Sequence, residues 1–241
     1  MTWATCERVL RQLRRDPRTV ALLMVVPPAL LVLFRWVMEG QDEAFDRVGG
    51  PMVGLFPFIT MFVVASVAML RERTTGTLER LMSMPIGKLD LLGGYDLAFA
   101  GLAGVQAVLT TAVGFGLLGL TAAGPIWAVI LIAIGNASLG MALGLFVSAF
   151  ARSEFQAVQF MPAFVLPQVL LAGLIAPRPS MARPLEVVSD VLPLTYAYSA
   201  LARITASGDL DRWLARDVAV IVGFTLLSLA LGAATLRRRT P

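Results

Sequence analysis

The amino-acid sequence predicts an all-α, polytopic membrane protein. Of its 241 residues, 57% are hydrophobic and only 15% are charged, and the mean hydropathy is +0.77. Several uninterrupted apolar runs reach the roughly 20 residues that a helix needs to cross a bilayer. A transmembrane β-barrel would instead show alternating strands of about 10 residues. The expected fold is therefore a bundle of membrane-spanning helices.

Six membrane-spanning helices are expected, in a single domain over residues 1–241. Their approximate ranges are 19–37, 51–70, 97–120, 126–150, 155–175 and 218–236. Three further segments have a different character: an amphipathic stretch at 1–18, a charged stretch at 71–95, and a stretch at 176–217 that is rich in proline at its start. The last of these is too long for a simple loop.

Residues 1–18 are predicted to form an interfacial helix. Trp3, Val9 and Leu13 alternate with Arg8 and Arg11 at helical spacing. A helix of this kind lies in the membrane interface with its apolar side chains inward and its arginines toward the headgroups. This segment is therefore expected to lie on the membrane rather than to cross it.

Two patterns inside the expected spans bear on helix packing. Pro27 and Pro28 should kink the first span or leave backbone carbonyls without helical partners, because proline has no N–H group. Gly140 and Gly144 form a GxxxG step in the fourth span, which permits close approach of another helix. We therefore expect irregular backbone in the first span and tight packing at the fourth.

The distribution of charge predicts the orientation in the membrane. Six spans place both termini on one side, and most of the 20 Lys and Arg residues fall on that side. The positive-inside rule then makes both termini and the 71–95 segment cytoplasmic. The same rule explains the isoelectric point of about 10.0, so nucleic acid is not an expected partner.

The composition excludes several kinds of chemistry. Histidine is absent and Cys6 is the only cysteine, which leaves no Cys/His metal site, intramolecular disulfide or histidine base. The expected spans contain no Asp, Glu or Lys, and Arg35 lies only near an edge, so an ion-coupled transporter or intramembrane hydrolase is disfavoured. Gly87-Lys88 also lacks the context of a phosphate-binding loop. Energy for uphill transport would have to come from another chain.

The segment 71–95 is predicted to contain a short amphipathic helix. Thr74 or Thr75 is expected to cap it, with Glu79 in its first turn, and Pro85 and Gly87 to end it. Its apolar stripe follows the i, i+3, i+4 pattern and consists of Leu78, Leu81 and Met82. A charged helix of this kind at a membrane surface is expected to bind a partner.

The run RERTTGTLERLMSMPIGKLDLL resembles the cytoplasmic loop of ABC-2 type exporter permeases, in which E-R-x-x-G-T-L-E-x-L-x-x-x-P follows the second span. Two other stretches agree in order: QAVQFMPAFVLPQVLLAGLIAP from Gln156 is similar to the fifth span of the family, and PLTYAYSALARI from Pro193 to the stretch after it. The closest type is the daunorubicin/doxorubicin-resistance permease. Gly93-Gly94 departs from the glycine–lysine pair of many members. The resemblance extends over essentially the whole chain.

The resemblance implies a transport subunit of the cell (plasma or inner) membrane that exports a hydrophobic or amphipathic drug, antibiotic or lipid. Such a subunit pairs with a second permease, identical or related, and binds two copies of an ABC ATPase subunit. ATP and Mg²⁺ would bind to the ATPase, and this chain would carry no cofactor, metal or catalytic residue. Segment 71–95 would be the coupling helix region. The residues expected to contact the ATPase are Arg71, Glu72, Arg73, Thr74, Gly76, Thr77, Leu78, Glu79, Arg80, Leu81 and Pro85.

The resemblance also implies an external gate in segment 176–217, formed by short helices that re-enter the outer leaflet. The gate candidates are Pro193, Thr195 and Tyr196. Neutral polar residues inside the spans could line the substrate pathway, or they could form ordinary interhelical hydrogen bonds, worth about 0.6 kcal/mol each. The pathway candidates are Gln106, Thr110, Asn136, Gln159 and Gln168.

Two other functions remain as alternatives. A membrane scaffold without transport activity could recruit a cytosolic partner through the same charged helix. An intramembrane lipid-modifying enzyme is disfavoured, because no set of catalytic groups can be assembled from the spans. The scaffold differs from the exporter in one respect that can be measured, since it predicts partner binding without substrate-dependent ATP turnover.

Overall fold

A computed structural model describes residues 2–83 and 87–235, apart from the side chain of Met82, and this part of the chain consists of helices and the loops that connect them. The α-helices are α1 (Thr2–Arg15), α2 (Pro17–Val37), α3 (Asp42–Thr74), α4 (Thr77–Ser83), α5 (Lys88–Thr111), α6 (Ile126–Val147), α7 (Glu154–Leu171), α8 (Arg183–Asp190), α9 (Pro193–Ala206) and α10 (Arg212–Thr235). A π-helical turn, η1 (Ala112–Leu117), extends α5, and two 3₁₀ turns are η2 (Ser148–Phe150) and η3 (Arg178–Ser180).

Five helices of the described chain are long and apolar enough to cross a membrane. They are α2, α3, α5 with η1, α6 with η2, and α10. These correspond to five of the six expected spans. The expected fifth span coincides with α7, which has 18 residues and contains Gln156, Gln159 and Gln168. These polar residues lower its hydropathy, so the count of six spans is not confirmed.

Two helices begin earlier than expected. α3 begins at Asp42, so that Asp42 and Glu43 lie in its first turn, where negative charge is favourable to the helix dipole. α5 begins at Lys88, so residues 88–95 form its first turns. Segment 71–95 is thus divided among the end of α3, α4 and the start of α5.

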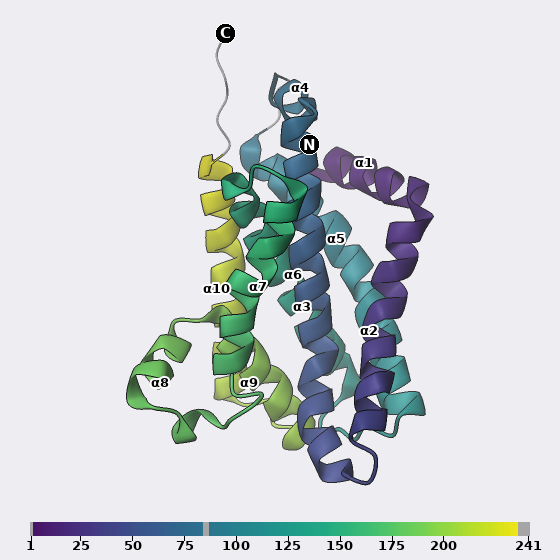
Figure 1. The fold of residues 1–241 in the computed structure, drawn as a ribbon, viewed down its shortest axis with the longest axis vertical. Coiled ribbons are helices and arrows are strands. Elements are labelled where there is room, and N and C mark those ends of the chain that lie inside the picture. Colours follow the sequence, from purple (N-terminus) through teal and green to yellow (C-terminus); the bar gives the residue numbers. More distant parts are fainter. Residues whose placement is uncertain (1, 84–86, 236–241) are drawn as a thin grey trace.

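Helices α3 and α6 form the centre of the bundle. A Cβ atom added to Gly140 would lie 2.2 Å from the carbonyl oxygen of Phe58, and one added to Gly144 would lie 2.3 Å from that of Phe62. Only glycine allows two backbones to approach so closely. The close packing expected from the GxxxG step is therefore confirmed. Around this pair lie α2, α5, α7, α9 and α10 (Figure 1).

Pro27 and Pro28 lie within α2, which continues from Pro17 to Val37 without interruption. Because Pro27 has no N–H group, the carbonyl of Leu23 loses its usual helical partner. The side-chain amide of Gln106 on α5 supplies the missing donor, with 2.9 Å between its Nε2 and the Leu23 oxygen. The expectation of a freed carbonyl is confirmed, and its partner comes from a neighbouring helix.

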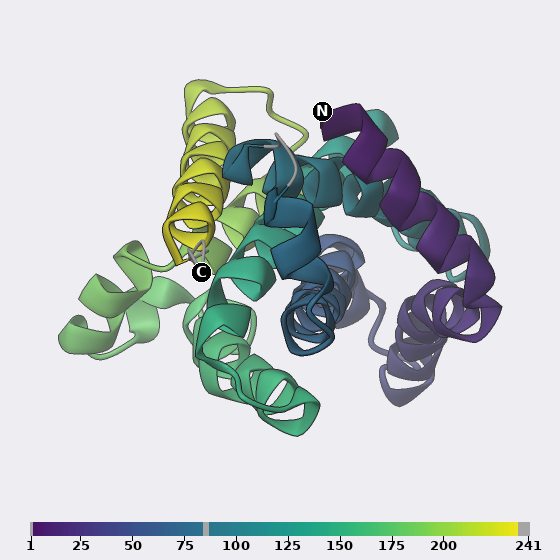
Figure 2. The ribbon, with the colours of Figure 1, turned by 90° about the horizontal axis from the view of Figure 1, so that it is seen from above.

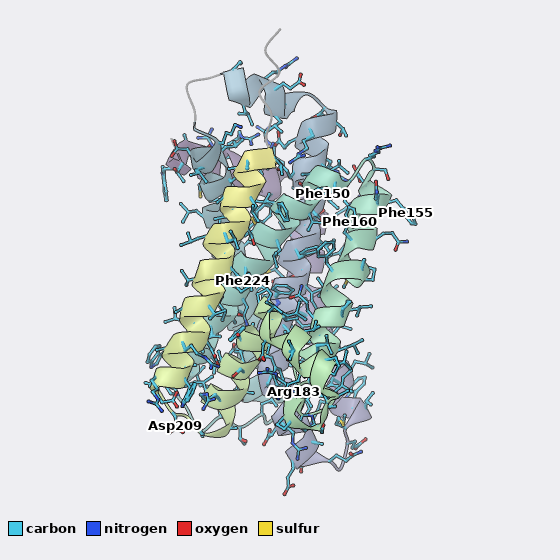
Figure 3. All side chains as sticks on the ribbon, turned by 90° about the vertical axis from the view of Figure 1, so that its left-hand side faces the viewer. Phe150, Phe155, Phe160, Arg183, Asp209 and Phe224 are labelled. Carbon is cyan, nitrogen blue, oxygen red and sulfur yellow. The ribbon has the colours of Figure 1, made fainter. Side chains whose placement is uncertain are left out.

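The two ends of the bundle have different structures. In Figure 1 the upper end contains α1, α4, the start of α5 and the end of α10, whereas the lower end contains the α2–α3 turn, α8 and α9. Seen from above, α1 lies across the upper end (Figure 2). In Figure 3, Phe150 and Phe155 lie toward the upper end, and Arg183 and Asp209 lie at the lower end. Helix α1 and the C-terminal end of α10 therefore lie at the same end of the molecule.

Segment 176–217 contains η3, α8 and α9, which confirms the expectation of short helices there. α9 is inserted among α3, α6 and α10. Its inward side chains are fully buried: Leu194, Ala197, Ala200, Leu201 and Ile204. By contrast, α8 exposes Leu185, Val187 and Val188. Re-entry of these helices into a membrane stays a prediction.

Candidate functional site

The upper end of the bundle contains most of the residues that the sequence singled out. Helix α3 ends there at Thr74, and the hydroxyls of Thr74 and Thr75 donate to the carbonyl of Arg71, at 3.2 and 2.7 Å. Gly76 follows with φ of +72°, a conformation that other residues rarely adopt. The expectation that Thr74 or Thr75 caps the short helix is therefore wrong, because both hydroxyls complete α3 instead. Gly76 then turns the chain into α4.

Helix α4, Thr77–Ser83, is amphipathic as expected. Leu78 and Leu81 are buried, with 7% and 9% of their surface exposed, and they pack into the cluster that also contains Tyr95. Glu79 and Arg80 lie on the exposed side. Pro85 lies outside the described residues. The local i, i+3 pattern was sufficient to predict which side of this helix faces the bundle.

Glu72 lies in a three-residue cluster with Arg8 and Tyr95, which we call the Arg8–Glu72–Tyr95 cluster. Glu72 is only 7% exposed, and its Oε1 accepts from Arg8 Nη1 at 3.0 Å and from the Tyr95 hydroxyl at 2.7 Å. Arg8 Nη2 also donates to the Tyr95 oxygen at 2.7 Å. The expectation that Glu72 belongs to an exposed docking face is therefore wrong. Its carboxylate joins α3 to α1 and α5.

The electrostatics of Arg8 reflect this environment. Burial lowers the pKa of Arg8, but the neighbouring Tyr95 and Glu72 outweigh burial, so the pKa lies above its ordinary value. The guanidinium also lies over the Tyr95 ring, 5.5 Å from its centroid, a geometry that favours a cation. Arg8 is therefore held in its charged form at the junction of three helices. No local pattern indicated that Arg8 and Tyr95 are the partners of Glu72, because they lie 64 and 23 positions away.

The residue before Glu72 forms a second link. Arg71 donates from Nε and Nη2 to the two carboxylate oxygens of Glu154, at 2.7 and 3.0 Å. Hydrogen bonding from Arg71 lowers the pKa of Glu154. Arg73, the next arginine, is half-buried. Two neighbouring residues of α3 therefore bind different helices. Arg71 binds α7, and Glu72 binds α1 and α5.

A cavity of about 510 Å³ adjoins these links, between the α1–α2 elbow, α3 and α5. Its polar lining includes Asp16, Arg71, Glu72 and Tyr95. Its apolar lining includes Val63, Val67 and Phe99. A few polar groups at one side of an apolar cavity can orient an amphipathic ligand. The cavity therefore has the lining expected for such a molecule.

Gln106 and Thr110, two of the pathway candidates, have structural partners. Gln106 is fully buried on α5 and also accepts from the Thr60 hydroxyl of α3 at 3.1 Å. Thr110 donates to the carbonyl of Gln106 at 2.8 Å. Gln106 thus joins α2, α3 and α5. Interhelical hydrogen bonding, the alternative to a role in the substrate pathway, therefore accounts for the contacts of Gln106.

The other pathway candidates lie in different environments. Asn136 on α6 is fully buried, and neither polar atom of its amide has a partner among the described residues. Gln168 on α7 donates to the Phe164 carbonyl at 3.0 Å, and Gln159 is exposed. None of the five candidates lines the 510 Å³ cavity. Their role in a substrate pathway stays a prediction.

The gate candidates lie in the first turn of α9, directly after α8. Pro193 begins α9. Thr195 donates to the Ser189 carbonyl and Tyr196 to the Asp190 carbonyl, both at 2.7 Å. These contacts fix the angle between α8 and α9, and a role in gating stays a prediction.

Asp217 was not singled out by the sequence. It is fully buried at the start of α10, where its Oδ1 accepts from Arg216 at 2.8 Å.

The fold and this site define a multi-pass helical membrane protein with a charged, cross-linked end. The family model for ABC-2 type transporters matches residues 2–205. The chain therefore belongs to the ABC-2 type transporter family. This membership confirms the resemblance that was drawn from the sequence motifs.

Three relatives illustrate the range of the family. The chain is 27% identical over 168 residues to ABC transporter G family member 20 of Dictyostelium discoideum, covering 70% of this chain and 23% of that protein. It is 24% identical over 199 residues to the linearmycin resistance permease protein LnrN of Bacillus subtilis, covering 83% and 51%. It is 25% identical over 178 residues to the probable multidrug ABC transporter permease YbhS of Escherichia coli, covering 73% and 47%. The chain thus spans about half or less of each relative.

Proposed function

We propose that this chain is the membrane-spanning subunit of an ATP-driven exporter that moves a hydrophobic or amphipathic molecule, drug-like or lipid, out of the cell. It would pair with a second permease copy and bind two ATPase subunits, which carry the ATP and Mg²⁺. Both termini would be cytoplasmic. Membership of the ABC-2 type transporter family supports the proposal, as do relatives whose names refer to linearmycin resistance and to multidrug transport.

The observation that carries the proposal is the two-sided packing of α4. Leu78 and Leu81 hold this short helix against the bundle, while Glu79 and Arg80 face outward. A helix fixed in this way presents its charges to a partner without losing its position. We assign α4 as the coupling helix, with Glu79 and Arg80 as the groups that contact the ATPase. The assignment replaces the broader charged face expected from the sequence.

Helix α3 provides the route from α4 to the opposite end of the bundle. Its 33 residues span about 50 Å. At the upper end it joins α4 through Gly76. At the lower end it packs closely against α9, where a Cβ on Gly54 would lie 2.4 Å from the Leu201 side chain and one on Gly50 2.9 Å from the Thr205 side chain. A displacement of α4 would therefore reach the gate candidates through one continuous helix.

Coupling would then work by biasing two arrangements of the membrane helices. The nucleotide state of the ATPase subunits would set the position of α4, and α3 would transmit it to α9. Arg71 and Glu72 would carry the same displacement sideways, to α7 and to α1 with α5. The 510 Å³ cavity, at the cytoplasmic end by this assignment, would receive an amphipathic substrate before the change.

The test is co-purification of the tagged chain with an ATPase encoded beside its gene, followed by ATPase measurement in lipid with hydrophobic drugs and lipids added in turn. One compound class should raise turnover. Glu79→Lys should abolish this stimulation while leaving the amount of folded chain unchanged. Glu7→Lys, a charge reversal at another exposed glutamate, paired on α1 with Arg11, is the control and should be stimulated normally. Normal stimulation of the Glu79→Lys complex would overturn the coupling role, and a complex whose turnover ignores every compound would favour a scaffold.

A further inference from the structure

The lower end of the bundle contains a second cavity, of about 670 Å³, which is remote from α4. It lies between the start of α3, the end of α7, η3, α8 and α9. Three arginines from three elements line it: Arg47 of α3, Arg178 of η3 and Arg203 of α9. One carboxylate, that of Glu186, also lines it, and this group accepts from Arg183 at 3.0 Å. The lining therefore contains more basic than acidic side chains.

The three arginines differ in how far their charges are already paired. Arg178 donates to the hydroxyl of Ser189 at 2.8 Å and to the carboxylate of Asp190, so it is fixed in place. Arg47 is exposed and makes no ion pair with any residue in 2–83 or 87–235. Arg47 consequently has its full hydrogen-bonding capacity available to a ligand.

Arg203 is also incompletely paired. Its nearest carboxylate, that of Asp211, lies 3.7 Å from Nη1, which is beyond hydrogen-bond distance. Its Nε is buried and has no partner in the described part of the chain. The side chain of Arg203 is nevertheless 33% exposed and lines the cavity. Its guanidinium therefore has donors available to an anionic ligand there.

The remaining lining indicates what kind of anion fits. Tyr198 and Ser199 contribute hydroxyl groups, and Leu174, Ile175 and Val48 contribute an apolar wall. Arg47 is close enough to Tyr198 to oppose the rise in its pKa that burial causes. Guanidinium groups bind phosphate oxygens in pairs of parallel hydrogen bonds. An anionic head with an apolar body would satisfy both parts of the lining.

We propose that this cavity binds the phosphate group of an amphipathic molecule, with Arg47 and Arg203 as its principal ligands. Arg178, held by Ser189 and Asp190, lines the cavity in a fixed position. A membrane phospholipid and a soluble phosphate share this chemistry. The site does not depend on the direction of transport or on the role of α4, so it can be tested without an ATPase subunit.

The test is native mass spectrometry of the full purified chain in detergent. The probes are phosphatidylglycerol, diacylglycerol with the same acyl chains, and inorganic phosphate as a competitor. The wild-type chain should retain phosphatidylglycerol in preference to diacylglycerol. Arg47→Gln and Arg203→Gln should each weaken retention about tenfold, because each removes charge-assisted hydrogen bonds. Arg212→Gln, at an exposed position at the start of α10 and outside the cavity, is the matched control.

The competitor distinguishes the two sources of phosphate. Displacement of phosphatidylglycerol by inorganic phosphate would show that the site accepts a soluble phosphate, whereas resistance to displacement would show that the lipid body is required. Equal retention of phosphatidylglycerol by wild type, Arg47→Gln and the double variant Arg47→Gln/Arg203→Gln would overturn the proposal, as would equal retention of diacylglycerol. Arg47 is exposed and unpaired in the described chain, so its variant keeps the fold and makes this outcome decisive.

Discussion

Glu72 of α3 and Tyr95 of α5 share a hydrogen bond of 2.7 Å, and Arg8 of α1 donates to both. Glu72 belongs to the stretch that resembles the coupling loop of the family, yet its carboxylate faces the bundle. These bonds connect α1, which lies across the upper end of the bundle (Figure 2), to α3, the helix that leads into α4. The positions of α1 and of the end of α3 are therefore linked through one carboxylate.

Replacing Glu72 should destabilise the folded protein more than replacing Tyr95. Glu72→Gln leaves Arg8 without a counter-charge, which we expect to cost about 2 kcal/mol, less than for a fully buried pair because 27% of the Arg8 side chain is exposed. Tyr95→Phe removes one hydrogen-bond donor and should cost about 1 kcal/mol. Unfolding in detergent measures both. The double variant Arg8→Gln/Glu72→Gln should cost less than the sum of the single variants, and strict additivity would contradict direct pairing.

Replacing Gly140 by alanine should weaken the contact between α3 and α6. The new methyl group would overlap the Phe58 carbonyl, and the shift needed to relieve this should cost about 1–3 kcal/mol. Gly135→Ala is the control on the same helix, since a Cβ there would lie 3.9 Å from its nearest neighbour, Ile221. Thermal unfolding should show a lower Tm for Gly140→Ala alone. Equal Tm values would mean that α3 and α6 separate at little cost.

The link between Arg71 and Glu154 should depend on pH. Hydrogen bonding from Arg71 holds the folded-state pKa of Glu154 below its ordinary 4.5. A lowered pKa stabilises the folded state above the ordinary pKa, and this contribution is lost as the pH falls through the folded-state value. Glu154→Gln should therefore have a lower Tm than wild type at neutral pH, and the difference should shrink below about pH 4.5. A difference independent of pH would show that charge on Glu154 is unimportant.

Local sequence patterns predicted the parts of the fold that depend on neighbouring positions. Apolar runs located five spans, and the spacing of Leu78 and Leu81 predicted the inward side of α4. The same patterns could not predict the direction of Glu72, because its partners come from two distant helices. The span expected at α7 is not confirmed, since the glutamines of this helix reduce its hydropathy. The direction of Glu72 could not be predicted because it is set by long-range contacts.

The hydrogen bond from Gln106 to the Leu23 carbonyl, which Pro27 leaves without a helical donor, gives a prediction about two residues together. Gln106→Leu removes the donor to the Leu23 carbonyl and should cost about 1–2 kcal/mol, because that oxygen is then buried without a partner. Pro27→Ala restores a backbone N–H four residues after Leu23, which can take over the bond. Gln106→Leu should therefore cost much less in the Pro27→Ala background.

Unfolding of the four chains of this cycle in detergent measures the coupling. Asn136→Leu is the matched control, since it also replaces a fully buried amide by leucine, but that amide has no partner in the described chain. Its effect on stability should be the same in the wild-type and Pro27→Ala backgrounds. If Gln106→Leu were equally costly in both backgrounds, the Leu23 carbonyl would not be what Gln106 stabilises, and its role would lie instead in the bond from Thr60 or in a ligand.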